Sequence, residues 1–376
     1  LHDALPIYPS KRNDKCRRLL KMPQAMMSYL RLMKTMSLPL IPTTIIGSLP
    51  KPPWLAADWY SIAGNWRLSG EALREAQDDA TRLAVAEQIE AGIDILCDGE
   101  QRRPTHHTYF LTGLNGVDFK TLKPKTVRAG KLTQDVPRVV GPLSLRSKLT
   151  LDDYAFVRGL TQAPVKMTLP GPSTLVDGAL DEYYGDERTL ALAYADLLNE
   201  EMRALVAAGC QMIQLDEPAV TRLPEKLHAW GIEALDRAFA GIDAVTCVHV
   251  CYGYGQRAKN GKQWKHGYDE ILPALAKANV AQVSLEFAEP ALPASLLDML
   301  PGKVIQYGVI DVGHNELETA ALVADRLRAA LEVIPANRLI AAPDCGCTAL
   351  PRGVARAKLD AMVAGARIVR AELSGK

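Results

Sequence analysis

Short apolar segments alternate with longer amphipathic segments along most of this chain, and this alternation constrains its fold more than any other feature. From Thr43 onward, eight runs rich in Val, Ile and Leu can be recognised: 44–48, 95–100, 165–170, 212–217, 245–251, 282–287, 304–311 and 338–343. Strands that alternate with helices indicate repeated βα units and a parallel sheet. Eight such units make a (β/α)8 TIM barrel, which we predict, and a doubly wound open sheet is the main alternative.

Helical spacing of apolar residues separates these runs. We predict helices at about 71–91, 151–160, 187–208, 223–240, 267–277, 292–299, 316–333 and 352–372. The clearest helix follows Asp186, which can cap its first turn, and ends at Gly209. The stretch 101–150 fits neither a helical nor a strand period. We expect it to form a β-hairpin-like insertion after the second strand, over one mouth of the barrel.

The domain organisation follows from length and charge. With 376 residues, 48% of them hydrophobic, the chain can bury a large core, and a barrel of this length is commonly one domain. We assign 35–376 to the barrel. The segment 1–34 is basic and lacks the apolar core of a signal peptide, so we expect a poorly ordered leader, with Met33 or Met36 as candidate start. A transit peptide is the alternative interpretation.

Charge and cysteine content exclude several classes of protein. Beyond residue 32 the chain has 37 basic and 41 acidic residues, so no nucleic-acid surface is indicated. Seven cysteines in a chain of this length do not make a disulfide scaffold, and they indicate reduced thiols in the cytoplasm. No apolar run reaches the roughly 18 residues that a membrane span requires.

Polar side chains stand at the ends of seven of the eight apolar runs. They are Ser48, Glu100, Asp216 with Glu217, His249 with Cys251, Glu286, Asp311, and Asp344 with Cys345. In a (β/α)8 barrel the C-terminal ends of all strands meet at one mouth, where the reactive residues lie. The sequence therefore predicts one shared site at that mouth.

A metal site is the most specific prediction within this group. His249 and Cys251 are two residues apart on a strand, so their side chains point to the same face. Together with Glu286 and Cys345 they supply the nitrogen, sulfur and oxygen ligands that tetrahedral zinc prefers. The alternative is that His249 and Cys251 are ordinary core residues. Cys347 competes with Cys345 for the last ligand position.

Two carboxylates at strand ends, Glu100 and Asp216, allow more than one interpretation. They could hold an ammonium group, act as acid and base, or form salt bridges with Arg102 or Arg103. His106 and His107 lie in the irregular insertion, where we expect them to be surface residues.

Seven short motifs in order connect this chain to a known family. They are Ile46-Gly47-Ser48, Asp98-Gly99-Glu100, Gln214 to Ala219, His249 to Tyr252, Ser284-Leu285-Glu286, Gly308 to Asp311 and Pro343 to Gly346. On these motifs the chain resembles the catalytic C-terminal half of cobalamin-independent methionine synthase. Members of that family are zinc-containing barrels that transfer a methyl group to the thiol of homocysteine.

The resemblance implies a role for each matching position. It makes His249, Cys251, Glu286 and Cys345 the zinc ligands. It makes Ile46, Gly47, Ser48, Glu100 and Asp216 the residues that bind the amino-acid part of homocysteine. His314 is the candidate catalytic proton donor, although the family has its His one residue earlier, where Gly313 stands here. The long family members also have an N-terminal barrel that helps to bind polyglutamyl folate, for which 376 residues leave no room.

The resemblance therefore implies a zinc-dependent homocysteine methyltransferase whose methyl donor is methyl-folate or a methylated corrinoid protein. Short relatives include the epoxyalkane:coenzyme M transferases, which use the same zinc-thiolate chemistry on other electrophiles. An enzyme of that type is one alternative, and a barrel with a purely structural zinc is the other.

Overall fold

Six parallel strands form the main sheet of the computed structural model, which describes residues 29, 36–57, 64–127, 132–252 and 267–375. In spatial order they are β3 (Lys166–Pro170), β5 (Met212–Asp216), β6 (Val245–Val250), β7 (Gln282–Leu285), β8 (Val304–Ile310) and β9 (Leu339–Pro343). Every residue of these strands is buried. Burial on both faces is expected of a parallel sheet covered by helices, and it explains why the runs read as continuously apolar.

The two edges of this sheet are joined through the first two predicted strands. Thr43 pairs with Ala341 of β9, Thr44 pairs with Ile95, and Leu96 pairs with Val165 just before β3, all in parallel. The eight segments thus form a closed ring, which confirms the predicted TIM barrel. The runs 44–48 and 95–100 are wrong as full strands, because only their first residues pair and the rest turn into loops at the barrel mouth.

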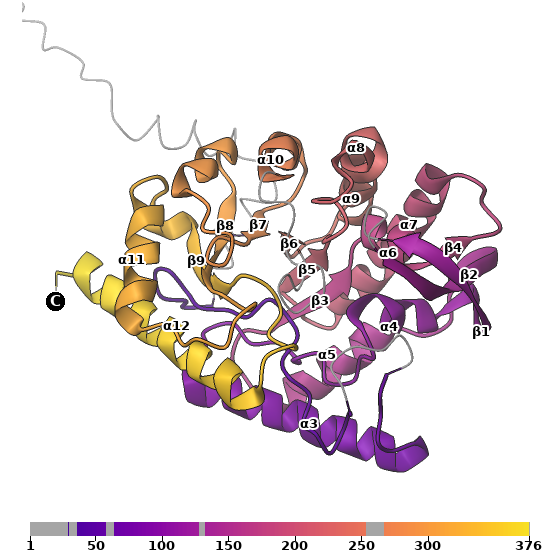
Figure 1. Cartoon of the computed structure of the whole chain (residues 1–376), viewed down its shortest axis with the longest axis horizontal. Coiled ribbons are helices and arrows are strands. Elements are labelled where there is room, and N and C mark those ends of the chain that lie inside the picture. Colours follow the sequence, from indigo (N-terminus) through magenta and orange to yellow (C-terminus); the bar gives the residue numbers. More distant parts are fainter. Residues whose placement is uncertain (1–28, 30–35, 58–63, 128–131, 253–266, 376) are drawn as a thin grey trace, which may run out of the picture.

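Helices surround this ring, as Figure 1 shows. They include α3 (Gly70–Ala91), α5 (Leu149–Leu160), α7 (Glu187–Ala207), α10 (Gly267–Lys277), α11 (Ala320–Leu331) and α12 (Arg352–Leu373). The predicted helix 223–240 is divided into α8 (Pro224–Lys226), a π-helical turn η1 (Leu227–Gly231) and α9 (Ile232–Ala238). The predicted helix 292–299 is a 3-10 helix, η3 (Ala294–Met299), and a second one, η4 (Ala336–Arg338), precedes β9.

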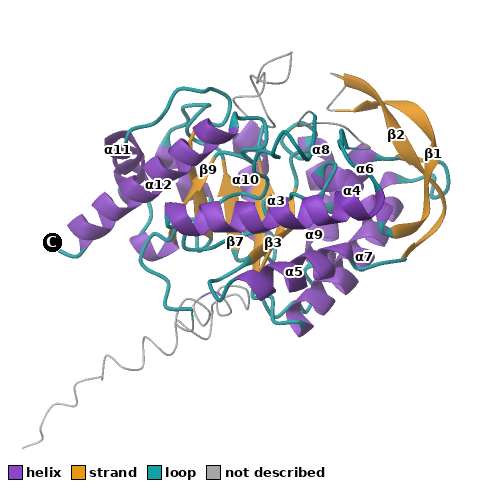
Figure 2. Cartoon of the chain, turned by 90° about the horizontal axis from the view of Figure 1, so that it is seen from below, coloured by secondary structure: helices purple, strands orange, loops and turns teal. Residues whose placement is uncertain are grey.

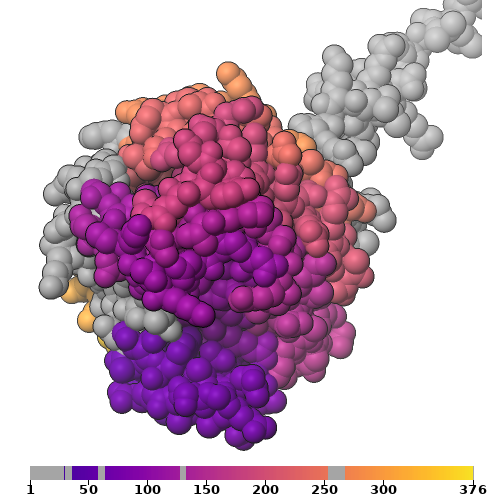
Figure 3. Space-filling model, turned by 90° about the vertical axis from the view of Figure 1, so that its right-hand side faces the viewer, coloured from indigo at the N-terminus to yellow at the C-terminus, as the bar shows by residue number. Residues whose placement is uncertain are grey.

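The insertion forms a long antiparallel hairpin, as predicted. Its strands are β1 (Leu114–Val127) and β2 (Leu132–Leu145), and β2 also pairs with the short β4 (Leu180–Asp181). Figure 2 shows the hairpin at one end of the molecule, and Figure 3 shows the molecule from that side. Two short helices stand between the hairpin and the barrel, α4 (His106–Thr112) and α6 (Pro172–Gly178), and the sequence did not predict either.

The opposite end of the barrel is closed by an apolar cluster at the strand starts. Tyr29 is only 1% exposed there, and it packs with Ile95, Met212, Val245, Ala281, Val304 and Ile340. Burial raises the pKa of the Tyr29 phenol. Tyr29 belongs to the predicted leader 1–34, whose other residues lie outside the described part of the chain. Among the described helices, none has the length and apolar character of a membrane span.

A buried carboxylate predicts how stability changes with pH. Glu201 of α7 is 1% exposed and accepts hydrogen bonds from the backbone N–H groups of Thr150 (2.9 Å) and Leu151 (3.2 Å) at the start of α5. Burial raises the pKa of Glu201 to about 7. Between the unfolded pKa and this value the folded state keeps a proton that the unfolded state loses, so the free energy of unfolding falls as pH rises.

The Glu201→Gln variant removes this titration. Relative to the variant, the parent should lose roughly 2 to 3 kcal/mol of unfolding free energy between pH 5 and pH 8. Urea unfolding of both proteins at the two pH values measures the difference. A parent-minus-variant difference that stays constant with pH would contradict the prediction.

Candidate active site

Three soft-metal ligands converge at the mouth of the barrel. His249 and Cys251, at the end of β6, and Cys345, just after β9, offer ligand atoms that all lie within 4.8 Å of one another. The two sulfur atoms are 3.5 Å apart, and each of the three residues is at most 5% exposed. Cys251 and Cys345 are 94 residues apart in the sequence. They lie together because all strands of the barrel are parallel, which brings their C-terminal ends to one side.

The orientation of His249 suits a metal ligand. Its Nδ1 lies 2.9 Å from the Ser284 hydroxyl, whereas its Nε2 is buried and has no hydrogen-bond partner among the described residues. Metal-binding histidines are typically held through their second nitrogen in this way. Burial disfavours the charged imidazole, but the nearby Cys251 sulfur outweighs it, so the pKa of His249 is raised. An orphaned nitrogen beside two thiols fits zinc.

Glu286, the fourth predicted ligand, lies next to this group but not within it. It follows β7, is fully buried, and its Oε2 accepts a hydrogen bond of 3.0 Å from the backbone N–H of Tyr252. Its carboxylate is not among the atoms that lie within 4.8 Å of one another. Its role as a ligand stays a prediction. Cys347 also lies outside the group, and burial raises the pKa of its thiol to about 12.

All five residues predicted to bind the amino acid line one small hollow. Ile46, Gly47, Ser48, Glu100 and Asp216 surround it, together with His249 of the metal group. A Cβ atom at Gly47 would come within 2.5 Å of Glu100 Oε1, so glycine is needed for the Glu100 carboxylate to lie where it does. The two carboxylates and one metal ligand thus face a shared space.

Glu100 is held in place by its surroundings. Its backbone has a φ of +55°, in the left-handed region that non-glycine residues seldom adopt. Its Oε1 accepts a hydrogen bond of 3.0 Å from Thr168 and lies 3.5 Å from Arg103. The predicted salt-bridge alternative therefore applies to Glu100. Arg102, the other predicted partner, pairs with Asp78 and Asp153 instead.

Asp216 is the second carboxylate that lines the hollow. It is 7% exposed, and its Oδ1 accepts a hydrogen bond of 2.7 Å from Gln214. Burial raises the pKa of Asp216 to about 7; His249 acts against this rise, and Glu100 adds to it. Glu100 and Asp216 are two buried carboxylates that line the same hollow, and an ammonium group placed there could form charge-assisted hydrogen bonds with both.

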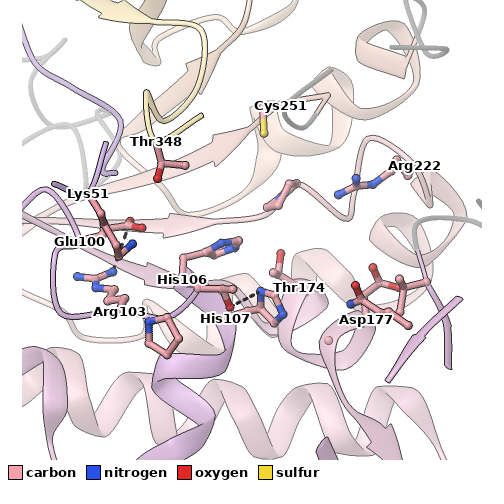
Figure 4. A pocket seen from close by; sticks show the side chains of 16 residues that line it. Lys51, Glu100, Arg103, His106, His107, Thr174, Asp177, Arg222, Cys251 and Thr348 are labelled. Atoms are coloured by element: carbon pink, nitrogen blue, oxygen red, sulfur yellow. Dashed lines mark hydrogen bonds and ion pairs between the residues drawn. The ribbon is translucent and has the colours of Figure 1, made fainter. Parts of the chain in front are cut away.

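A larger pocket of about 870 Å³, open mouth included, adjoins the hollow. Both are lined by Glu100, His106 and Pro218, and Cys251 lines the larger pocket as well. Figure 4 shows His106 pointing into this space, with Lys51 close to Glu100. Burial lowers the pKa of Lys51 to about 8, although Glu100 opposes this shift. The hairpin contributes Val127 and Gln134 to the wall of the larger pocket.

The prediction that His106 and His107 are surface residues is wrong. His107 is 8% exposed, and a Cβ at Gly178 of α6 would come within 2.8 Å of its ring. His106 is partly buried between the two cavities. Thr105 caps α4 by accepting a hydrogen bond from the backbone N–H of Thr108. The N-cap signal of Thr105, five residues after the strand-end Glu100, could have placed both histidines on a helix that begins near the mouth.

His314 lies at the rim of the barrel. Its Nδ1 is 2.7 Å from Asp311 Oδ2, its side chain is 42% exposed, and it lines neither cavity. Glu289 joins these two residues within 4.8 Å. A Cβ at Gly313 would come within 2.7 Å of the Glu289 carboxylate, so a histidine at position 313 would displace that group. A catalytic role of His314 stays a prediction.

Comparison with known proteins identifies the family. The sequence model described as "Cobalamin-independent synthase, Catalytic domain" matches residues 41–368. The chain belongs to the cobalamin-independent methionine synthase family. A methionine synthase of Saccharolobus solfataricus is 33% identical over 344 residues, which are 90% of this chain and 98% of the relative. The family resemblance inferred from the seven motifs is thus confirmed, and the chain is a methyltransferase.

One solved structure agrees with this assignment, and a more distant one shares only the fold. A B12-independent methionine synthase from Shewanella sp. W3-18-1, in complex with selenomethionine, is 42% identical, with a TM-score of 0.85 over 90% of this chain and 100% of that one. A methyltransferase from Methanosarcina mazei has 13% identity and a TM-score of 0.61, and shares the fold.

Proposed function

We propose that this methionine synthase family member transfers a methyl group to the sulfur of homocysteine and requires zinc for the transfer. The main observation in support of the proposal is that a group of metal ligands lies next to a hollow lined by carboxylates. The soft-ligand group of His249, Cys251 and Cys345 borders a hollow that also contains two buried carboxylates. A thiol that also carries an ammonium group fits both environments at once.

His249, Cys251 and Cys345 would hold the zinc, with Glu286 as fourth ligand from the adjacent strand. Zinc, when bound, lowers the pKa of a coordinated thiol so that the thiolate forms at neutral pH. The chain contributes the burial of all four side chains, which keeps water away from the reacting sulfur. The Ser284 hydroxyl, 2.9 Å from Nδ1 of His249, would hold the imidazole so that its Nε2 is left to bind the metal.

Glu100 and Asp216 would bind the ammonium group of homocysteine, and the backbone of Ile46, Gly47 and Ser48 would border its carboxylate. An ammonium between two buried carboxylates offsets their desolvation through charge-assisted hydrogen bonds. The Shewanella relative was solved with selenomethionine, whose amino-acid portion is the same as that of methionine, and this supports an amino-acid site.

The larger pocket would admit the methyl donor from the side of the hairpin, since it shares Cys251 and Glu100 with the thiol side. The thiolate sulfur forms a bond to the methyl carbon while the bond from that carbon to the donor breaks, and its electron pair leaves with the donor. Methyl-folate and a methylated corrinoid protein are the two donor classes that we consider. His314 is the predicted proton donor to the leaving group.

X-ray absorption of the zinc-loaded enzyme with and without homocysteine tests the proposal. We expect two sulfur ligands in the free enzyme and one additional sulfur after homocysteine is added, because a catalytic zinc exchanges a ligand or expands its shell. An unchanged shell with homocysteine and with coenzyme M would indicate a purely structural metal. Entry of sulfur from coenzyme M alone would favour the epoxyalkane-type alternative.

A cytoplasmic location is part of the proposal. The six cysteines in the described part of the chain are all free thiols. Free thiols that bind metal persist in a reducing compartment.

A further inference from the structure

A lysine lies inside the barrel beneath the proposed amino-acid site. Lys166 of β3 is 1% exposed, and its Nζ donates hydrogen bonds to Gln214 Oε1 at 2.7 Å and to Gln306 Oε1 at 3.0 Å. An ammonium group can only donate. Both amide oxygens must therefore point toward Lys166, which settles the orientation of both glutamine side chains.

The orientation of the Gln214 amide determines which atoms of the proposed site receive its hydrogen bonds. Because its oxygen faces Lys166, its Nε2 faces the other way and donates to Asp216 Oδ1 at 2.7 Å and to the Ile46 carbonyl at 2.9 Å. Asp216 and Ile46 both line the hollow. Gln214 itself is fully buried, so these hydrogen bonds are shielded from bulk solvent.

The buried lysine has no evident benefit for stability. Interiors of (β/α)8 barrels are usually filled by branched apolar residues, and a buried charge is often replaced by an apolar side chain without loss of stability. Burial also lowers the pKa of Lys166, although the nearby Asp216 and Glu100 carboxylates oppose this shift. A function in the site explains why a lysine occupies this place.

We propose that Lys166 is a positioning residue for amino-acid recognition, because it fixes the Gln214 amide and through it the Asp216 carboxylate and the Ile46 carbonyl. This inference rests on the proposed function. Without the ammonium, Gln214 Oε1 loses the donor that anchors it, and a buried amide oxygen without a partner is costly. The Gln214 side chain would then shift to find another donor, and Asp216, which accepts from its Nε2, would leave the orientation in which it faces an ammonium group.

The test compares two thiols that differ only in the amino group. Homocysteine and 4-mercaptobutyrate share the thiol and the carboxylate, and only homocysteine carries an ammonium. In the zinc-loaded Lys166→Met variant we expect about tenfold weaker binding of homocysteine by titration calorimetry, the loss of one hydrogen bond to a charged group. Binding of 4-mercaptobutyrate should change less than about twofold, and zinc content should not change.

A second buried lysine provides a matched control. Lys303 is 7% exposed, burial lowers its pKa as well, and its Nζ donates only to the backbone carbonyls of Ala278 (2.6 Å) and Val280 (2.8 Å) among the described residues. Lys303→Met should therefore leave the ratio of the two thiol affinities unchanged. If Lys166→Met does not fold, Gln214→Met removes the amide that links Lys166 to Asp216. It should show the same selective loss of homocysteine binding.

Equal weakening of both thiols in Lys166→Met, or unchanged homocysteine binding, would overturn the inference. Failure of the proposed function gives a different result. In that case the parent enzyme itself would bind homocysteine no better than 4-mercaptobutyrate.

Discussion

The Cys345→Ser variant is expected to lose its zinc and, with it, methyl transfer. A serine hydroxyl remains protonated at neutral pH and replaces a thiolate that lies 3.5 Å from Cys251 Sγ. Removal of a residue that hydrogen-bonds a metal ligand typically lowers metal affinity by about 10- to 100-fold. Removal of a ligand itself should therefore lower zinc affinity by more than about 100-fold. Zinc per protein after dialysis, measured by plasma emission, and homocysteine methylation are the two readouts.

The matched control is Cys347→Ser, two residues further on. Cys347 is equally buried, but it lies outside the ligand group, and its backbone N–H donates to the Ser48 carbonyl. This variant should keep its zinc. Both variants should remain folded by circular dichroism, since position 345 lies at the mouth and not among the packed strands. Zinc retained in Cys345→Ser but lost in Cys347→Ser would move the ligand by two residues.

Two further variants complete the ligand assignment. His249→Ala should lose zinc as Cys345→Ser does, because it removes one of the three ligand atoms that lie within 4.8 Å of one another. Glu286→Gln tests the fourth position. If the Glu286 carboxylate is the ligand that the substrate sulfur displaces, Glu286→Gln should lose less zinc than His249→Ala.

The Asp216→Asn variant should use homocysteine about 10- to 100-fold less efficiently, which corresponds to roughly 1.5 to 3 kcal/mol for a hydrogen bond to a charged group. Gln214 donates to Oδ1 of Asp216, so asparagine would keep its oxygen there and turn its NH2 group toward the substrate. A donor facing an ammonium group repels it. The measurement is kcat/KM for homocysteine, and bound zinc should stay constant.

Coenzyme M provides the contrasting substrate for this variant, because it carries a sulfonate and no cation. The Asp216→Asn substitution should not weaken its binding. If the variant kept the homocysteine kinetics of the parent, or if the parent preferred the sulfonate thiol, the amino-acid interpretation would be lost. An enzyme of the epoxyalkane:coenzyme M transferase type would then be the better description.

The sequence alone determined the barrel and the side of the barrel that carries the site. Eight apolar runs between helical segments specify repeated βα units, because burial on both faces of a strand and on one face of a helix imposes different periods on the chain. Polar residues at the ends of those runs then had to meet at one mouth. This rule brought His249 and Cys251 together with Cys345 from two separate segments.

Tertiary structure decided which residues lie between and beneath those strand ends. His106 lines two cavities because α4 and the hairpin fold over the mouth. The N-cap signal of Thr105 could have indicated the helix, but the periodicity of 101–150 did not show that it covers the mouth. Lys166 and Gln306 are 140 residues apart, yet the polar contact between them lies inside the closed ring. Hydrogen bonds across a barrel depend on which side chains share a layer of its interior. That layer is set by the stagger of all eight strands together, which no single segment of the sequence encodes.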